Sequence, residues 1–293
     1  MPDLESIKPY LVLGLALGGV FAMSGVGLVV LYRATGVLNL AYGAVGAMGA
    51  LIGSSLLEWG VPQVIAFLAS ILFGGVATLL YGGVFGPPFA AREPLIKAVA
   101  TLGFLLILLG LMQYLWGPLP RTIKLPTNDW SFSIAGVQVS WTQVLGVVFS
   151  IVITFATAVF LRTTKVGTAM RALANDREIT ATLGVPVRNV EAVAWFGSGI
   201  ICGAAGLLLA NLVALDAASL TFLVIPALAA ALIGQLRSLW ITLVAGLVIG
   251  LVQSCLTAFT DPNLADYRNM TPFVLAIIAL LWFARKRQVL VRN

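Results

Sequence analysis

The sequence predicts an all-α polytopic membrane protein with about nine transmembrane helices, within a range of eight to ten. Hydrophobic residues make up 60% of the 293 residues and charged residues only 10%, whereas a soluble domain is about a quarter charged. The apolar residues also gather in runs of about 20, the length with which a helix crosses roughly 30 Å of hydrocarbon. The whole chain, 1-293, is therefore interpreted as a single transmembrane domain.

Nine apolar runs can be followed along the chain. They cover residues 10–32, 37–57, 61–86, 95–116, 141–161, 190–213, 220–236, 238–257 and 270–284. The second run is rich in glycine and alanine, and Pro226 interrupts the seventh. Because backbone breaks at membrane depth are tolerated only where they face protein or a water-filled cavity, we expect one or two broken spans.

The charges predict the orientation of the spans. With the N-terminus outside and the C-terminus in the cytoplasm, only four of the 17 lysines and arginines fall outside: Lys8, Arg121, Lys124 and Arg268. Most of the acids fall outside as well: Asp3, Glu5, Glu58, Asp129, Asp216, Asp261 and Asp266. Basic residues favour the cytoplasmic side of membrane proteins. Because the positive charge lies in membrane-flanking loops, it does not indicate a nucleic-acid partner.

The longest outer segment is the loop 117–140. It contains three prolines and the alternating stretch "SFSIAGVQVSW", a pattern that predicts a short β-hairpin in an ordered external connection. Small residues four apart, such as Gly14 with Gly18 and Gly246 with Gly250, predict close helix packing in lipid.

The composition excludes several kinds of chemistry. The chain has no histidine, so zinc sites and Ser-His-Asp triads built from it alone are excluded. Its two cysteines, Cys202 and Cys255, lie in apolar runs and are interpreted as small hydrophobic residues. It also lacks a G-x-x-x-x-G-K-[ST] phosphate loop. We therefore expect no catalytic residue, no metal site and no cofactor bound by the chain itself.

Polar groups inside the predicted spans are uncharged. Proton- and ion-coupled carriers generally need buried ionisable groups, so their absence from the span centres disfavours that class. Asn39 and Tyr42 are three residues apart and would share one helix face. Thr101, Gln113, Asn211 and Gln253 are the other polar candidates. Each could line a pathway or simply join two helices by a hydrogen bond.

The segment 162–190 is the most polar part of the chain and lies inside by the charge argument. In "TAMRALANDREITATLG", Asn175 or Asp176 can cap a helix that has Glu178 in its first turn. Gly184, followed by Pro186, marks the end of that helix. A short capped helix between two spans is suited to docking a soluble partner. A solvated basic loop held at the membrane remains the alternative.

The same segment resembles a known family. "TKVGTAMRALANDREITATLGVPVRNV" is similar to "R-T-x-x-G-x-A-x-R-A-x-A-x-D-x-E-x-A-x-x-L-G-I-x-V" of the branched-chain amino acid ABC transporter permeases, and Glu178 and Gly184 match the E-A-A-x-x-x-G spacing of ABC importers. "GVLNLAYGAVGAMGA", "AVATLGFLLILLGLMQYLWGP" and "LIGQLRSLWITLVAGLVIGLVQS" resemble other parts of that family in the same order.

The resemblance implies a membrane subunit of an ATP-driven importer in a bacterial or archaeal cytoplasmic (inner) membrane. It implies two ATPase subunits that carry ATP and Mg, a second homologous permease, with a heterodimer favoured over a homodimer, and an external solute-binding protein. The helix from Asp176 to Leu183 would be the coupling helix, with Glu178 capping or orienting it and Gly184 permitting the turn. The implied coupling residues are Asp176, Arg177, Glu178, Ile179, Thr180, Leu183 and Gly184. The implied pathway residues are Asn39, Tyr42, Thr101 and Pro226.

Three departures bear on the substrate and the docking. Ile179-Thr180 replace the family's alanine pair, Ala41-Tyr42-Gly43-Ala44 replace "A-H-G-E", and Gly234-Gln235-Leu236-Arg237-Ser238 replace "G-G-L-G-S". Branched-chain or other hydrophobic amino acids are the expected cargo. Urea, short amides, aromatic acids and sugars, carried by relatives, stay as alternatives. The rival functions are a stand-alone carrier or channel for a neutral solute, and a membrane scaffold.

Overall fold

The computed structural model describes residues 4–89, 92–119, 121, 123, 127, 130–134, 136–213, 216–222, 224–258 and 270–291. The helices are α1 (Leu4–Thr35), α2 (Tyr42–Glu58), α3 (Gln63–Phe89), α4 (Pro94–Trp116), α5 (Trp141–Thr163), α6 (Lys165–Asn175), α7 (Arg177–Thr182), α8 (Val187–Leu212), α9 (Ala217–Phe222), α10 (Val224–Ile233), α11 (Leu239–Leu256) and α13 (Thr271–Val291). Two strands, β1 (Ser131–Ile134) and β2 (Val137–Ser140), separate α4 from α5.

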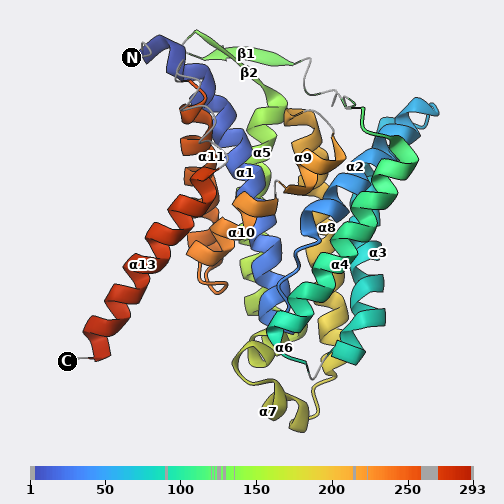
Figure 1. Ribbon diagram of the computed structural model, residues 1–293, viewed down its shortest axis with the longest axis vertical. Helices are drawn as coiled ribbons and strands as arrows, with labels where there is room; N and C mark the ends of the chain where they lie inside the picture. The colour runs from blue at the N-terminus through green and yellow to red at the C-terminus, as the bar shows by residue number, and fades with distance from the viewer. Residues whose placement is uncertain are drawn as a thin grey trace.

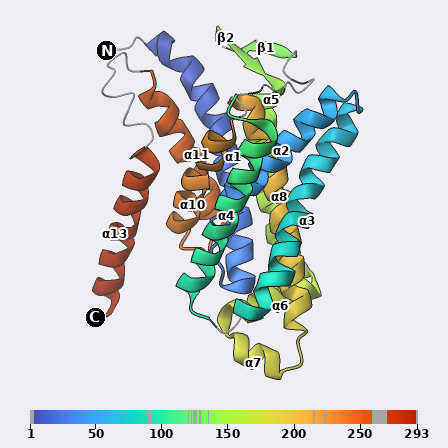
Figure 2. The same ribbon diagram turned by 45° about the vertical axis from the view of Figure 1, so that its right-hand side comes forward.

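Helix α1 lies at the centre of the bundle. It packs against α5, α8, α10 and α11, and Figures 1 and 2 show it surrounded from both directions. Phe21, Met23 and Val26 on this helix are at most 1% exposed. A helix that is apolar on all sides lies either in a protein core or in lipid, and α1 occupies the core of this bundle.

The predicted small-residue pairs bring helices into backbone contact. A Cβ atom on Gly18 of α1 would lie 2.8 Å from the Cα atom of Leu247 on α11, and one on Gly250 would meet Gly18 itself. Close approach of this kind strengthens packing where no hydrophobic driving force acts between helices. The two glycine pairs of α1 and α11 therefore face each other, a relation that their separate spacings do not specify.

Six helices in the described part of the chain are long and apolar enough to cross a membrane: α1, α3, α4, α5, α8 and α11. The other three predicted runs correspond to α2, to α9 with α10, and to α13. The chain is thus a multi-pass α-helical membrane protein, while the count of nine spans stays a prediction.

One of the two runs with weak helical patterns is interrupted among the described residues. Residues 36–41 are not helical, so α2 begins only at Tyr42. In the seventh run, the structure describes α9 and α10, with residue 223 outside the described residues, and Pro226 lies in α10. The break predicted at Pro226 stays a prediction.

The predicted hairpin is present between α4 and α5. Strands β1 and β2 pair in antiparallel register, with Ser131 opposite Ser140 and Ile134 opposite Val137. Ser140 then starts α5 with a capping box: its hydroxyl accepts from the Gln143 amide, and the Gln143 side chain accepts from the Ser140 amide. Reciprocal capping satisfies two amides that would otherwise be unpaired.

The N-terminal end of α1 and the hairpin lie at one end of the molecule, and α6 and α7 lie at the other (Figure 1). This separation is what the predicted orientation requires, because the hairpin was assigned outside and α6–α7 inside. Several of the charges used for that assignment fall outside the described residues, namely Asp3, Lys124, Asp129, Asp261, Asp266 and Arg268. The orientation itself stays a prediction.

Candidate coupling helix and pathway residues

Segment 162–190 forms two short helices rather than one. Thr164 caps α6 by accepting a hydrogen bond from the Gly167 amide at 2.9 Å. Asp176 ends α6, and its carboxylate accepts from the Ile179 amide at 2.9 Å to cap α7. Asp176 adopts an extended conformation with φ −153°. The predicted cap at Asp176 is confirmed, and it turns the chain between the two helices.

The apolar side chains at Ile179 and Leu183, in and directly after α7, point away from the bundle. Ile179 is 60% exposed and Leu183 77% exposed, and Glu178 is exposed beside them, whereas Thr180 is 3% exposed. The N-cap of α7 is Asp176, so Glu178 has no capping role here. These exposed apolar residues at the polar end of the molecule form a surface suited to a protein partner.

Gly184 ends this surface in a left-handed conformation with φ +82°. Nothing lies within 4 Å of the position that its Cβ atom would take. A side chain at this position would therefore meet no neighbour, and only the backbone conformation would disfavour it. The turn after α7 needs glycine, or a residue that tolerates positive φ.

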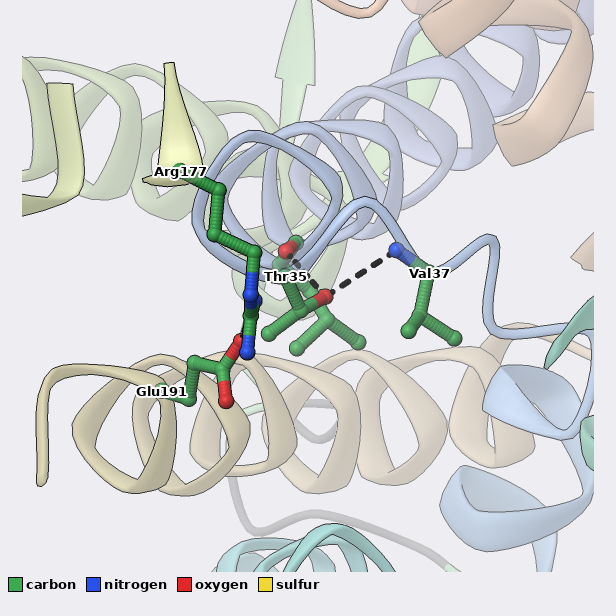
Figure 3. Close-up of polar contacts among 5 residues, drawn as sticks. Thr35, Val37, Arg177 and Glu191 are labelled. Carbon is green, nitrogen blue, oxygen red and sulfur yellow. Dashed lines mark hydrogen bonds and ion pairs between the residues drawn. The ribbon is translucent and has the colours of Figure 1, made fainter. Parts of the chain in front are cut away.

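Arg177, one of the predicted coupling residues, faces inward. Its guanidinium forms an ion pair with the carboxylate of Glu191 on α8, and Figure 3 shows the two side chains meeting beside Thr35 at the end of α1. Arg177 and Glu191 line a small cavity, and Lys97 of α4 lines it as well. The sequence does not predict this pair, because a partner 14 residues away on another helix leaves no local signal.

Asn39 and Thr101 organise the break between α1 and α2. The Asn39 side chain, 3% exposed, accepts from the Ala41 amide at 3.0 Å. The Thr101 hydroxyl accepts from the Leu40 amide at 3.0 Å and is within bonding distance of the Leu38 carbonyl oxygen at 3.1 Å. Buried backbone N–H and C=O groups need hydrogen-bond partners. Asn39 and Thr101 supply such partners to the non-helical residues between α1 and α2.

Asn39 and Tyr42 do not share a helix face, so that prediction is wrong. Asn39 precedes α2 and bonds its own backbone two residues on, a local contact that competes with helix formation. Tyr42 starts α2, is 2% exposed, and donates from its hydroxyl to the Ser198 carbonyl oxygen of α8 at 3.1 Å. Gly43 follows, and a Cβ atom there would meet the Thr221 carbonyl oxygen.

The remaining polar candidates lie apart from one another. Asn211, near the C-terminal end of α8, donates to the Ile123 carbonyl oxygen at 2.9 Å. The Gln253 amide oxygen on α11 is buried without a hydrogen-bond partner among the described residues, and Gln113 is half-buried on α4. Pro226 is buried in α10. The structure thus brings Asn39 and Thr101 together, but it does not gather the candidates into one site.

The comparisons with known proteins agree with this architecture. The sequence profile of the family described as "Branched-chain amino acid transport system / permease component" matches residues 10–280. The chain is 27% identical to the high-affinity branched-chain amino acid transport system permease protein BraD of Pseudomonas aeruginosa, over 96% of this chain and 95% of that protein. It is 23% identical to the corresponding permease protein LivH of Escherichia coli, over 92% of this chain and 91% of that protein.

A solved structure shares the fold. The complex described as "PsaBC from Streptococcus pneumoniae in complex with Fab" contains a chain that superposes with a TM-score of 0.52 at 14% identity, over 99% of this chain and 96% of that chain. The family match covers nearly the whole sequence, so the chain belongs to the branched-chain amino acid transport permease family and is an integral protein of the cytoplasmic membrane.

Proposed function

We propose that this chain is the transmembrane subunit of an ATP-driven importer that moves a small solute into the cytoplasm. The observation that carries the proposal is the exposed surface of α7, formed by Glu178, Ile179 and Leu183 between the Asp176 cap and the Gly184 turn. Apolar side chains at the charged end of a membrane protein are stabilised when a soluble subunit covers them. In this proposal the covering subunit is an ATPase.

The assembly would consist of two ATPases with their ATP and Mg, this chain, a second homologous permease and an external solute-binding protein. ATP-driven closure of the ATPases would push α7 and shift the helices between inward- and outward-facing arrangements. Branched-chain or other hydrophobic amino acids are the proposed cargo, because the full-length relatives carry that description. The uncharged pathway candidates Asn39, Tyr42 and Thr101 suit a solute that needs no fixed countercharge in the protein.

A stand-alone carrier is the competing function. A proton-coupled carrier would need a buried ionisable group, and the predicted span centres contain no acidic or basic residue. It would also leave α7 without a partner. Isolation of the tagged chain from its host in mild detergent, followed by mass spectrometry, separates the two functions. We expect one or two ATPases and a second permease in the sample. A chain that is isolated alone, even after crosslinking in intact cells, contradicts the importer.

A further inference from the structure

Helix α7 is attached to the membrane-spanning bundle by a side-chain contact as well as by the chain. Arg177, the first residue of α7, pairs with Glu191 on α8. The Arg177 side chain is 36% exposed and the Glu191 side chain 19%. Figure 3 shows the guanidinium extending from α7 to the α8 surface, next to Thr35. A displacement of α7 therefore acts on α8 directly at Glu191.

The pair borders a small cavity of about 30 Å³. The inner ends of α1, α3, α4, α7 and α8 all contribute to the lining of this cavity, and aromatic side chains form much of the wall: Tyr81, Phe85, Phe89 and Trp195. Arg177 and Glu191 also line a second, larger hollow of about 340 Å³, together with Arg188. The attraction between two partly buried side chains is screened less by water and salt than that between fully exposed ones.

A third charge faces the same cavity. Lys97 of α4 lies close enough to Arg177 and Glu191 to interact electrostatically with both. Among the described residues, Glu191 is the only acidic one that lines the cavity, where it faces Arg177 and Lys97, and the exposed Arg188 lies beside it in the larger hollow. Removing Glu191 would leave Arg177 and Lys97 to repel each other. Removing Arg177 would leave Glu191 with Lys97 as its neighbour.

Glu191 is also connected to the rest of the bundle. Trp195 lies one helical turn after Glu191 and packs against Tyr81 of α3, with ring centroids 5.4 Å apart. Tyr81 stacks on Phe104 of α4 at 4.8 Å. The Thr78 hydroxyl of α3 donates to the Trp195 carbonyl oxygen at 2.8 Å. A shift of α8 at Glu191 therefore reaches α3 and α4 through packed rings and a buried hydrogen bond.

We propose that Glu191 is a positioning residue that transmits movement of α7 to α8 and α4, with Arg177 and Lys97 as its two partners. This inference rests on the proposed function, because it assumes that an ATPase moves α7. Glu191 touches neither ATP nor solute in this account. Glu191 fixes the position of the coupling helix α7 relative to the membrane spans. Without Glu191, the docked ATPase would still hydrolyse ATP, but the bundle would move less for each ATP hydrolysed.

The test compares charge variants in the complete importer, reconstituted with its ATPases, second permease and binding protein. Uptake per ATP hydrolysed is the quantity measured. Glu191→Gln should lower it about tenfold, within the range known for residues on coupling networks. Arg177→Gln should lower it less, because Glu191 then keeps Lys97. The exchange Arg177→Glu with Glu191→Arg should restore it, since the cavity again holds two cations and one carboxylate.

Arg162→Gln is the matched control, because it removes one positive charge from an exposed position in the last turn of α5, outside the hollows that Arg177 and Glu191 line. It should leave uptake per ATP unchanged. Thermal melting of each purified variant separates a folding defect from lost coupling, and Arg177→Gln, at a partly exposed position, serves if Glu191→Gln does not fold.

Normal uptake per ATP in both single variants would overturn the positioning role while leaving the importer intact. Failure of the charge exchange to restore coupling in a well-folded protein would overturn it as well. If no ATPase accompanies the wild-type chain, the proposed function itself falls, and the positioning role falls with it. The composition of the wild-type sample thus separates the two failures.

Discussion

Tyr42 at the start of α2 donates a hydrogen bond to the carbonyl oxygen of Ser198 in the middle of α8, 3.1 Å away. The Ser198 hydroxyl in turn donates to the Gly27 carbonyl oxygen of α1 at 2.9 Å. These two bonds join three helices just beyond the break between α1 and α2. They are buried, with Tyr42 2% and Ser198 0% exposed, and they hold α2 at the point where its backbone becomes helical.

Gly27 provides the space that the Tyr42 hydroxyl occupies. A Cβ atom on Gly27 would meet that hydroxyl oxygen, so Gly27→Ala should destabilise the protein by about 1–3 kcal/mol through overpacking. Tyr42→Phe should cost only about 0.6 kcal/mol, as membrane hydrogen bonds do on average. Gly27→Ala should cost less in the Tyr42→Phe background than in the wild type. Melting of the four proteins in detergent tests the coupling, and additive effects would contradict this geometry.

Gly184 should tolerate asparagine but not isoleucine. Its φ of +82° is a conformation that asparagine adopts far more readily than a β-branched residue does, and there is open space around the position. Gly184→Ile should therefore abolish uptake without preventing membrane insertion, while Gly184→Asn keeps most of it. Cellular uptake and the amount of protein in the membrane fraction are measured together. Equal uptake by both variants would refute a conformational requirement at this turn.

Polar substitution of the exposed face of α7 should release the ATPase without destabilising the permease. Ile179→Ser with Leu183→Ser removes two apolar side chains that are 60% and 77% exposed. Exposed substitutions usually change stability by less than about 0.5 kcal/mol. We expect the ATPase to be lost during purification while the melting temperature of the permease stays the same. Trp59→Ser, at a 78% exposed position after α2, is the control and should retain the ATPase.

The two glycine pairs of α1 and α11 should be sensitive to any added side chain. Gly250→Val would force the Gly18 backbone away and should destabilise the fold by about 1–3 kcal/mol or more. Gly110→Val on α4, where nothing lies within 4 Å of the added Cβ atom, should have a much smaller effect. Both substitutions add the same side chain to a helical glycine, so a comparison of their melting temperatures isolates the helix contact. Equal melting would show that α1 and α11 are not in backbone contact.

Much of the fold follows from local signals in the sequence. The long apolar runs, the hairpin stretch and the Asp176 cap each depend on neighbouring residues, and the structure places a helix, a hairpin and a cap at those positions. Asn39 illustrates a local signal with two solutions. Its spacing to Tyr42 fits a helix face, but its side chain bonds the Ala41 amide instead, and the spacing pattern alone does not reveal that competition.

The candidate site could be predicted only in part. The sequence singles out the α7 segment as a candidate coupling helix because the residues of its motif are contiguous. The inward turn of Arg177 was not, because its partner Glu191 lies on another helix. Tyr42 and Ser198 are 156 positions apart in the chain, and Lys97 joins Arg177 and Glu191 only after three helix ends converge. Contacts of this kind depend on tertiary packing, which a periodic pattern does not encode.

The central claim, that this permease works with an ATPase, is tested most directly by transport in reconstituted vesicles. The complete complex is inserted into liposomes with the binding protein and a radiolabelled branched-chain amino acid on one side and ATP on the other. We predict uptake that requires hydrolysable ATP and stops when the ATPase is replaced by a hydrolysis-deficient variant. Uptake that continues unchanged without ATP would contradict the account and would favour a stand-alone carrier.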